Sequence, residues 1–349
     1  MSLVLHVDGD RWRAHLREVA VNRPGLVPVV KGNGYGFGLR RLARRSAWLE
    51  VDTVAVGTPS EVDDVASRFD GDILVLTGWR SFEASAIKPE HADRVIHTVG
   101  RMQDLEQLID ADATSRIVLE RMTSMKRHGF TARGLREAAA LARSRPGVRV
   151  EGASLHLPLG DGSNLGEAEQ LMTDVVAAGL ADIVWVSHLT ASEVAQLGAQ
   201  YPDVTFRQRI GTELWLGDRG ALQVRAHVLD SHPVDRGEAI GYRGRSAPRR
   251  GTVLVVSGGT AHGIGLEAPT GESSVRARVS TVARGGLDAL GLVKSPFTVA
   301  GKARYFAEPP HMQASLLFLP SGVAVPEVGE TVPVRVRYTA TDVDAVVIS

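Results

Sequence analysis

The sequence predicts an α/β protein, with an N-terminal (β/α)8 barrel of the TIM type followed by a C-terminal all-β domain. Three observations lead to this. Eight short apolar runs alternate with amphipathic helical stretches as far as about residue 222, helical periodicity then disappears, and Val-rich runs separated by Gly, Pro and Arg follow. The 349 residues suffice for two domains, predicted at 1–222 and 223–349. A doubly wound open sheet is the alternative for the first domain.

The barrel strands are predicted from runs rich in aliphatic and β-branched residues. The eight runs are Val27–Val30, Thr53–Val56, Ile73–Leu76, Arg94–Ile96, Arg116–Leu119, Gly152–Leu155, Ile183–Val186 and Val204–Phe206. Helices are predicted between them, including Arg40–Glu50, Ser60–Arg68, Met102–Ile109, Gly134–Arg143 and Gly166–Ala178. Two serines that precede glutamates, Ser60 and Ser192, are the predicted N-caps of their helices.

The second domain is predicted from short runs in which valine recurs between turn-forming residues. These runs are Val224–Leu229, Thr252–Val256, Val275–Val282, Leu316–Leu319, Val332–Tyr338 and Asp344–Ile348. Gly329 and Glu330 form a predicted turn before one of these strands.

Composition narrows the class of protein. The formal net charge is zero, which gives no electrostatic case for binding nucleic acid or an anionic membrane. Apolar runs stay well short of the roughly 20 residues of a membrane span, and the N-terminus does not resemble a signal peptide. The chain has no cysteine, so disulfides, thiolate nucleophiles and zinc–thiolate sites are excluded. We therefore expect a cytoplasmic enzyme without a metal site.

Lys31 stands in the most informative stretch of the sequence. Val29 and Val30 lead into this lysine, and a glycine-rich loop that carries Tyr35 follows. Lysine is scarce, with five in the chain against 35 arginines, and its amine becomes neutral more readily than a guanidinium does. A lysine at a strand end can form a Schiff base with an aldehyde cofactor, while loop amides receive the phosphate of that cofactor. A solvated loop lysine is the alternative interpretation.

Other polar residues follow the later strands of the predicted barrel. Because the carboxyl ends of barrel strands converge on one mouth, we expect them to lie near Lys31. They are Glu120 with Arg127, His156, His188 with Ser192, and Arg209 with Gly211 and Thr212.

These motifs resemble the alanine racemase family, which consists of fold type III enzymes that depend on pyridoxal 5′-phosphate (PLP). The Lys31 stretch is similar to the family pattern V-V-K-A-x-A-Y-G-H-G, and the other matches occur in the family's order. They are His6–Asp8, Ala55–Glu61, Met125–Phe130, Leu155–His156, Arg209–Thr212, Gly237–Tyr242 and His311–Gln313.

The resemblance implies a role for each matching residue. Lys31 is the Schiff-base lysine and one of two acid/base groups at the substrate α-carbon. The cofactor phosphate is bound by Tyr35, Ser192, Gly211 and Thr212, the pyridine ring is contacted by His156 and Arg209, and the substrate is bound by Arg127, Glu120 and Met312. Since Arg209 can only donate hydrogen bonds, it leaves the pyridine nitrogen unprotonated, which favours quick reprotonation over side reactions.

Two departures from the family pattern concern catalysis. The family usually has a lysine, often carbamylated, where Glu120 stands, and we expect the Glu120 carboxylate to take over the role of that anion. The family's second base is a tyrosine in a G-Y-A-D-G motif, where this chain has Thr260. His262 is the nearest titratable substitute, and Tyr242 ranks below it.

The resemblance also implies a head-to-tail homodimer, in which Thr260, His262, His311 and Met312 face Lys31 of the other chain. The predicted function is that of a racemase or epimerase acting on a small amino acid. The substrate need not be alanine, because Phe37 replaces a family histidine and Gln313 an aspartate. The alternatives are a one-base lyase or dehydratase that acts on one enantiomer, and a PLP-binding protein without turnover.

Overall fold

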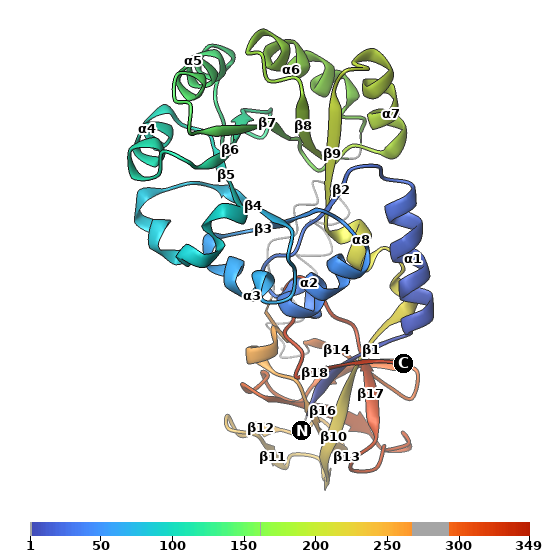
Figure 1. The fold of residues 1–349 in the computed structure, drawn as a ribbon. Helices are drawn as coiled ribbons and strands as arrows, with labels where there is room; N and C mark the ends of the chain where they lie inside the picture. The colour runs from blue at the N-terminus through green and yellow to red at the C-terminus, as the bar shows by residue number, and fades with distance from the viewer. Residues whose placement is uncertain (1, 161, 267–292) are drawn as a thin grey trace. The chain divides into compact units, whose positions relative to one another are not determined.

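The chain folds into two compact units. The computed structural model describes residues 2–160, 162–266 and 293–349. The barrel unit comprises Arg13–Gly217, and the β unit comprises Met1–Trp12 together with Asp218–Ser349. The chain therefore starts in the β unit, runs through the whole barrel and returns to the β unit (Figure 1).

Eight parallel strands form the sheet of the barrel unit, in the order β2-β9-β8-β7-β6-β5-β4-β3. A parallel bridge between Val29, just after β2, and Ala55 of β3 closes this sheet on itself. The prediction of a (β/α)8 barrel is confirmed, and the open doubly wound alternative is excluded by the closure. The strands are β2 (Leu26–Pro28), β3 (Thr53–Val56), β4 (Asp72–Gly78), β5 (Val95–Val99), β6 (Arg116–Arg121), β7 (Arg149–His156), β8 (Ile183–Ser187) and β9 (Thr205–Ile210).

Helices lie outside these strands, as Figure 1 shows for α4 to α7. They are α1 (Gly9–Val21), α2 (Leu39–Trp48), α3 (Val62–Ala66), α4 (Met102–Ala111), α5 (Ala132–Arg143), α6 (Leu165–Ala177), α7 (Ala191–Gln200) and α8 (Thr212–Leu216). The predicted cap Ser192 is wrong, because Thr190 caps α7 and its Oγ1 accepts from the Glu193 amide at 3.2 Å. The predicted cap Ser60 is also displaced by two residues, since Thr58 holds the N-cap position of a short 3-10 turn before α3.

Buried side chains fill the barrel unit on both faces of its sheet. Aliphatic residues of the helices pack against the outer faces of β5 to β9. A separate cluster, drawn from six of the strands, fills the interior as the layered core of such a barrel requires. This inner cluster consists of Val27, Val29, Ala55, Leu74, Ile96, Val118 and Trp185.

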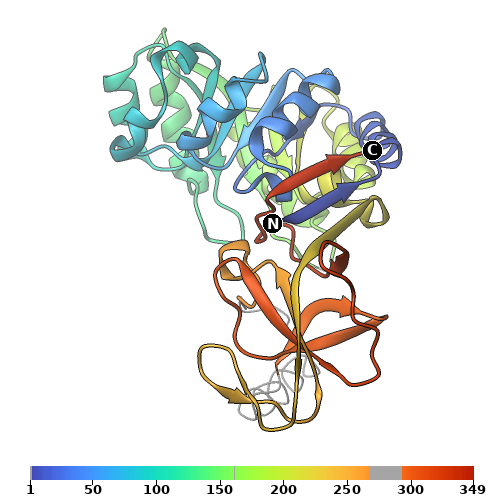
Figure 2. The ribbon, with the colours of Figure 1, turned by 90° about the horizontal axis from the view of Figure 1, so that it is seen from below.

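The β unit contains a closed antiparallel ring, because β10 pairs with both β13 and β17, and β16, β15 and β14 connect those two strands. The N-terminal and C-terminal strands β1 and β18 extend the sheet from β10, and Figure 2 shows them side by side. The strands are β1 (Leu3–Val7), β10 (Leu222–Val234), β11 (Ala239–Ile240), β12 (Arg245–Ser246), β13 (Gly251–Ser257), β14 (Lys294–Val299), β15 (Lys302–Phe306), β16 (Ala314–Pro320), β17 (Thr331–Val334) and β18 (Ala345–Ile348).

The all-β character of this second unit agrees with the prediction. The structure divides the chain between residues 217 and 218, and it gives the N-terminal strand, which the expected range 1–222 included, to the β unit. The predicted strand Val275–Val282 lies outside the described residues. Among the described residues, no helix combines the length and the apolar character that crossing a membrane requires.

Gly152 in β7 allows two strands of the barrel to approach closely. Its φ of +112° lies in the left-handed region, and a Cβ built on it would lie 2.0 Å from the carbonyl oxygen of Ile183 at the start of β8. Both the backbone conformation and the available space therefore require glycine at this position.

We expect Gly152→Ala to lower the free energy of unfolding by roughly 2–5 kcal/mol, because it combines backbone strain with an overpacked strand contact. Urea unfolding followed by circular dichroism measures this change. Gly160→Ala is the matched control, since a Cβ there meets nothing within 4 Å. Equal stabilities of the two variants would contradict this account of β7.

Candidate active site

The polar residues predicted to form a site gather at the carboxyl ends of the barrel strands. Lys31 follows β2, Glu120 is the penultimate residue of β6, His156 is the last residue of β7, and Arg209 is the penultimate residue of β9. Hydrogen bonds between neighbouring strands fix their relative heights, since Glu120 is in register with Ser154, and His156 with Ser187. The barrel therefore brings residues far apart in the sequence to one mouth.

Lys31 is placed by backbone contacts on both sides of its strand. The Val29 amide donates to the Ile210 carbonyl at 2.8 Å, and the Val30 amide donates to the Ala55 carbonyl at 2.7 Å. Burial lowers the pKa of Lys31 below its ordinary value, and the positive charges of Arg127 and Arg209 act in the same direction. The mouth thus favours a neutral amine, the form that acts as nucleophile or base.

Glu61 holds the loop after Lys31, a role that the sequence reasoning missed. Its Oε1 accepts from the Gly32 amide at 2.7 Å, and its Oε2 accepts from the Gly57 amide at 2.6 Å. One carboxylate therefore joins the loops that follow β2 and β3. The available signal was the motif Thr58-Pro59-Ser60-Glu61, which has the spacing of a capping box.

Tyr35 lies in the glycine-rich loop with a left-handed φ of +55°, uncommon for a residue other than glycine. Its side chain is buried, and burial raises the pKa of its phenol to about 12, so it remains a hydrogen-bond donor at neutral pH. A Cβ built on Gly211 would lie 2.0 Å from the Tyr35 hydroxyl. The structure thus brings together Tyr35 and the Gly211–Thr212 backbone, which were predicted to form one phosphate site.

Arg209 is 7% exposed and crosses from β9 to β7. Its two terminal nitrogens donate to Ser154 Oγ and to the Leu155 carbonyl, both at 3.0 Å. Its Nε, which is also buried, has no hydrogen-bond partner among the described residues. A buried N–H is rarely left unpaired, so this atom is available to donate to a water or to a ligand.

Glu120 is 4% exposed and lies near two cations. Burial raises the pKa of its carboxyl, while the charges of Arg209 and Arg127 oppose that rise. Arg127 belongs to the exposed loop after β6. The Glu120 carboxyl therefore lies within electrostatic reach of both cations, and its role in orienting Arg127 stays a prediction.

His156 and His188 form a histidine pair in the mouth, with ring centres 5.5 Å apart in an edge-to-face arrangement. Ser187 Oγ lies 2.8 Å from Nδ1 of His156. Burial, followed by the charges of Arg209 and Arg127, lowers the pKa of His156 to about 3. The His156 imidazole is therefore neutral at physiological pH, in the form that can pack against an uncharged ring.

Of the barrel residues predicted to bind the cofactor, Ser192 is the one whose role the structure supports least. It is exposed on the first turn of α7, and its Oγ accepts from Gln196 Nε2 at 3.3 Å. Among the described residues, no hydrogen bond joins it to Tyr35 or Gly211.

The remaining predicted residues, Thr260, His262 and Met312, lie in the β unit. His262 is buried and uses both ring nitrogens: Nδ1 accepts from the Gly259 amide at 3.3 Å, and Nε2 lies 3.1 Å from Asp344 Oδ1. Asp344 also accepts from the Leu3 amide at 2.7 Å. This chain of contacts ties the His262 loop to β1 and leaves neither nitrogen available for proton transfer.

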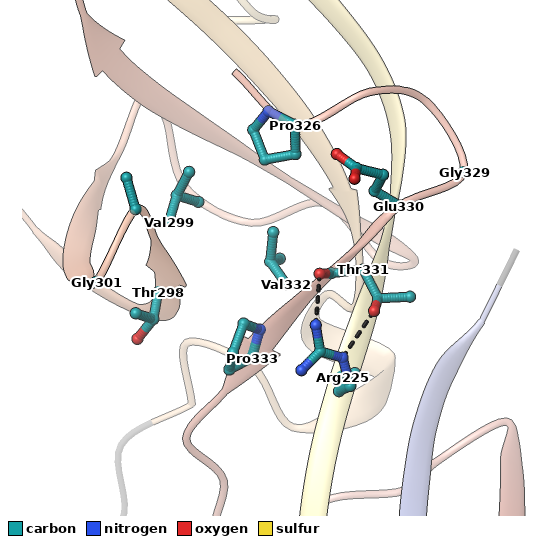
Figure 3. A pocket seen from close by; sticks show the side chains of 11 residues that line it. Arg225, Thr298, Val299, Gly301, Pro326, Gly329, Glu330, Thr331, Val332 and Pro333 are labelled. Carbon is teal, nitrogen blue, oxygen red and sulfur yellow. Dashed lines mark hydrogen bonds between the residues drawn. The ribbon is translucent and has the colours of Figure 1, made fainter. Parts of the chain in front are cut away.

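A pocket on the surface of the β unit is lined by residues that were not predicted to form a site (Figure 3). Among the described residues that line it, the charged side chains are Arg225 and Glu330. The guanidinium of Arg225 donates to the hydroxyl of Thr331 at 2.7 Å and to its carbonyl at 2.8 Å. None of the predicted site residues lines this pocket.

A family model and curated relatives match this chain. The family model described as "Alanine racemase, N-terminal domain" matches residues 7–215. An alanine racemase of Nitratidesulfovibrio vulgaris is 28% identical over 262 residues, which cover 68% of this chain and 69% of that protein.

Solved racemase structures share the fold of the whole chain. The crystal structure of alanine racemase from Bartonella henselae with covalently bound pyridoxal phosphate aligns with a TM-score of 0.72 at 17% identity, covering 98% of both chains. Histidine racemase from Leuconostoc mesenteroides aligns with a TM-score of 0.65 at 18% identity, covering 95% of this chain and 87% of that one. These structures confirm a barrel followed by a β-strand unit. Because the family model spans more than half of the sequence, the chain belongs to the alanine racemase family.

Proposed function

We propose that this protein is a PLP-dependent racemase or epimerase acting on a small amino acid. The observation that carries the proposal is the buried Nε of Arg209, which needs an acceptor at the strand end. The pyridine nitrogen of PLP is such an acceptor. Lys31, with its lowered pKa, is suited to bind the cofactor aldehyde, and the Tyr35 hydroxyl beside Gly211 is suited to bind its phosphate. The residues present therefore fit the cofactor.

When bound, PLP supplies a conjugated ring that accepts the electron pair left by removal of the α-proton. The residues of this chain supply positioning and proton transfer. Arg209 would hold the ring nitrogen by donating from Nε, and it would keep its proton, because burial lowers its pKa only to about 10. Arg127, oriented by Glu120, binds the substrate carboxylate or the cofactor phenolate oxygen. Lys31 holds the cofactor and carries a proton to and from one face of the α-carbon.

We further propose that the protein works as a head-to-tail homodimer in the cytoplasm. The barrel mouth contains Lys31, whereas Thr260 and Met312 belong to the β unit. Met312 is 64% exposed and Tyr242 is 88% exposed, as expected for apolar side chains that a second copy covers. The β unit of each copy would then complete the site of the other.

The Thr260 position supports a second candidate, a PLP-binding protein without turnover. A threonine hydroxyl is a very poor base, and the other predicted group, His262, is held by Asp344. Proton exchange separates the alternatives. In deuterated water, loss of the α-proton from both enantiomers supports racemisation. Loss from one enantiomer supports a one-base enzyme, and loss from neither supports a binding protein.

We expect the purified protein, supplied with PLP, to show a visible absorption band that borohydride abolishes. Lys31→Ala removes the band, because the Schiff base is formed by the amine of this side chain. Lys302→Ala, which changes an exposed lysine of the β unit, is the matched control and keeps it. Absence of the band in the unmodified protein would overturn both candidate functions.

We expect Glu120→Gln to weaken PLP binding and substrate turnover by about 10- to 100-fold. The substitution keeps the shape of the side chain and removes the negative charge that offsets Arg127 and Arg209, and the expected loss corresponds to about 1.4–2.8 kcal/mol. Cofactor titration and steady-state kinetics measure the loss. Glu137→Gln, at an exposed pair with Arg133, is the control. Normal binding and turnover in Glu120→Gln would show that the carboxylate has no such role.

We expect the protein to lose stability as the pH falls from about 6.5 towards 4. The unfolded chain binds a proton at His156 near pH 6.5, whereas the folded protein does so only near pH 3, so acid favours unfolding throughout this interval. One such group contributes at most about 1.4 kcal/mol per pH unit, and less where solvent reaches the ring.

Urea unfolding at pH 7 and pH 4.5 tests this expectation. His156→Gln should show a smaller difference between the two pH values than the unmodified protein. It keeps part of the difference, because burial also lowers the pKa of His97 to about 4. An unchanged difference in His156→Gln would mean that the ring is protonated in the folded state.

A further inference from the structure

The β unit contains a histidine held by a buried carboxylate, and no catalytic role has yet been given to it. His311 Nε2 lies 2.6 Å from Glu308 Oε1. Glu308 is 2% exposed, whereas 29% of the His311 side chain is exposed. Because a carboxylate accepts, the ring donates from Nε2, and this tautomer leaves the lone pair of Nδ1 on the other side of the ring.

The surroundings of this pair hold it in place. Gly241 has a φ of +70°, and a Cβ built on it would lie 2.0 Å from the Glu308 carboxyl carbon, so the backbone packs directly on the carboxylate. The next residue, Tyr242, places its ring 4.6 Å from the His311 ring. The carboxylate restricts the orientation of the imidazole, and the exposed ring of Tyr242 lies beside it.

The same pair is attached to the loop that carries Thr260. The Thr260 amide donates to the His311 carbonyl at 2.8 Å, and the Ala261 amide donates to the Met312 carbonyl at 3.0 Å. Gly259 packs against both carbonyls, since a Cβ there would lie 2.1 Å from that of His311 and 2.6 Å from that of Met312. His311 therefore occupies a fixed position beside Thr260.

We propose that His311, oriented by Glu308, is the acid/base group that the β unit contributes to the racemase site, in place of the tyrosine missing at position 260. This inference rests on the proposed function and on the shared site of the homodimer. The choice follows from a comparison of the candidate side chains near this loop. Thr260 is not a base, both nitrogens of His262 are engaged, and His311 has one nitrogen bound to a carboxylate and is partly exposed.

In each turnover, one proton then leaves the α-carbon and another is added to its opposite face. Neutral His311 takes the α-proton at Nδ1 as the C–H bond breaks, and PLP, when bound, would supply the acceptor for the electron pair. Lys31, in its ammonium form, then donates a proton to the opposite face and becomes neutral. The reverse reaction uses the same groups in opposite roles, and Glu308 stabilises the positive charge that His311 acquires.

A test on the full-length protein, independent of turnover, uses nitrogen-15 NMR of labelled histidine. His311→Gln identifies the signal of this ring. We expect the neutral ring to carry its proton on Nε2, and Glu308→Gln to shift the population towards the Nδ1-protonated form. A ring protonated on Nδ1 in the unmodified protein would overturn the proposal, because no lone pair would then be available to take the α-proton.

The second test follows α-proton exchange of each enantiomer in deuterated water. We expect His311→Gln to slow exchange from one enantiomer by about 10²- to 10⁴-fold and to leave Lys31-dependent exchange from the other within a few-fold. Glu308→Gln, which acts through His311, should slow the same enantiomer to a smaller degree. His232→Gln, at an exposed histidine beside Asp230, is the matched control and should change neither rate.

The outcomes separate this inference from the proposed function. If the borohydride-sensitive band is absent, the proposed function itself fails. If the band is present and His311→Gln leaves both exchange rates unchanged, the assignment of His311 alone is overturned. Equal slowing of both enantiomers together with a lost band would show a structural role for His311 and would also overturn the assignment.

Discussion

The position of the Val29–Val30 segment between β9 and β3 determines the rest of the site. Its amides donate to Ile210 on one side and to Ala55 on the other, and the buried indole of Trp215 donates to the Val29 carbonyl at 2.8 Å. These contacts close the barrel and fix the point at which the chain leaves the sheet as Lys31. The hydrogen-bond register between neighbouring strands then sets the heights at which Glu120, His156 and Arg209 lie at the mouth of the barrel. A shift of β2 by one residue would turn Lys31 away from the mouth.

Charge at the mouth is arranged to accept an anion. Lys31, Arg127 and Arg209 act on one another and on the histidine pair, and their repulsion adds to burial in lowering the pKa of Lys31 and His156. Glu120 and Glu61 offset only part of this positive potential. A phosphate and a substrate carboxylate would offset the remainder. The same repulsion that makes the protein alone less stable therefore favours binding of the cofactor and the substrate.

Most of the barrel was predictable because its strands are buried on both faces and read as continuous apolar runs. The helix caps were predicted two residues too late, because serine and threonine are both common cap residues and only the spacing of Thr58 and Thr190 to the following glutamate favours the threonines. The N-terminal strand was also hard to place. Its partners β10 and β18 lie more than 200 residues away in the sequence, and nothing local encodes that pairing. The same limit explains why the contact of His262 with Asp344, which is 82 residues away, could not be predicted.

The proposed replacement of the family tyrosine by Thr260 has consequences for a two-base mechanism in this fold. In the proposed mechanism a base must reach the face of the α-carbon opposite Lys31, and without a tyrosine phenol at position 260 that proton acceptor has to come from another side chain. A histidine on the adjacent loop meets this demand, since its imidazole accepts a proton at the nitrogen that the carboxylate behind it leaves free. Glu308 and His311 provide this combination, with the carboxylate buried against Gly241 and the ring partly exposed. The two acid/base groups would then be an imidazole and an amine, instead of a phenol and an amine. The imidazole becomes cationic on taking the proton whereas a phenol is neutral when protonated, so a buried counter-anion is needed here and Glu308 supplies it.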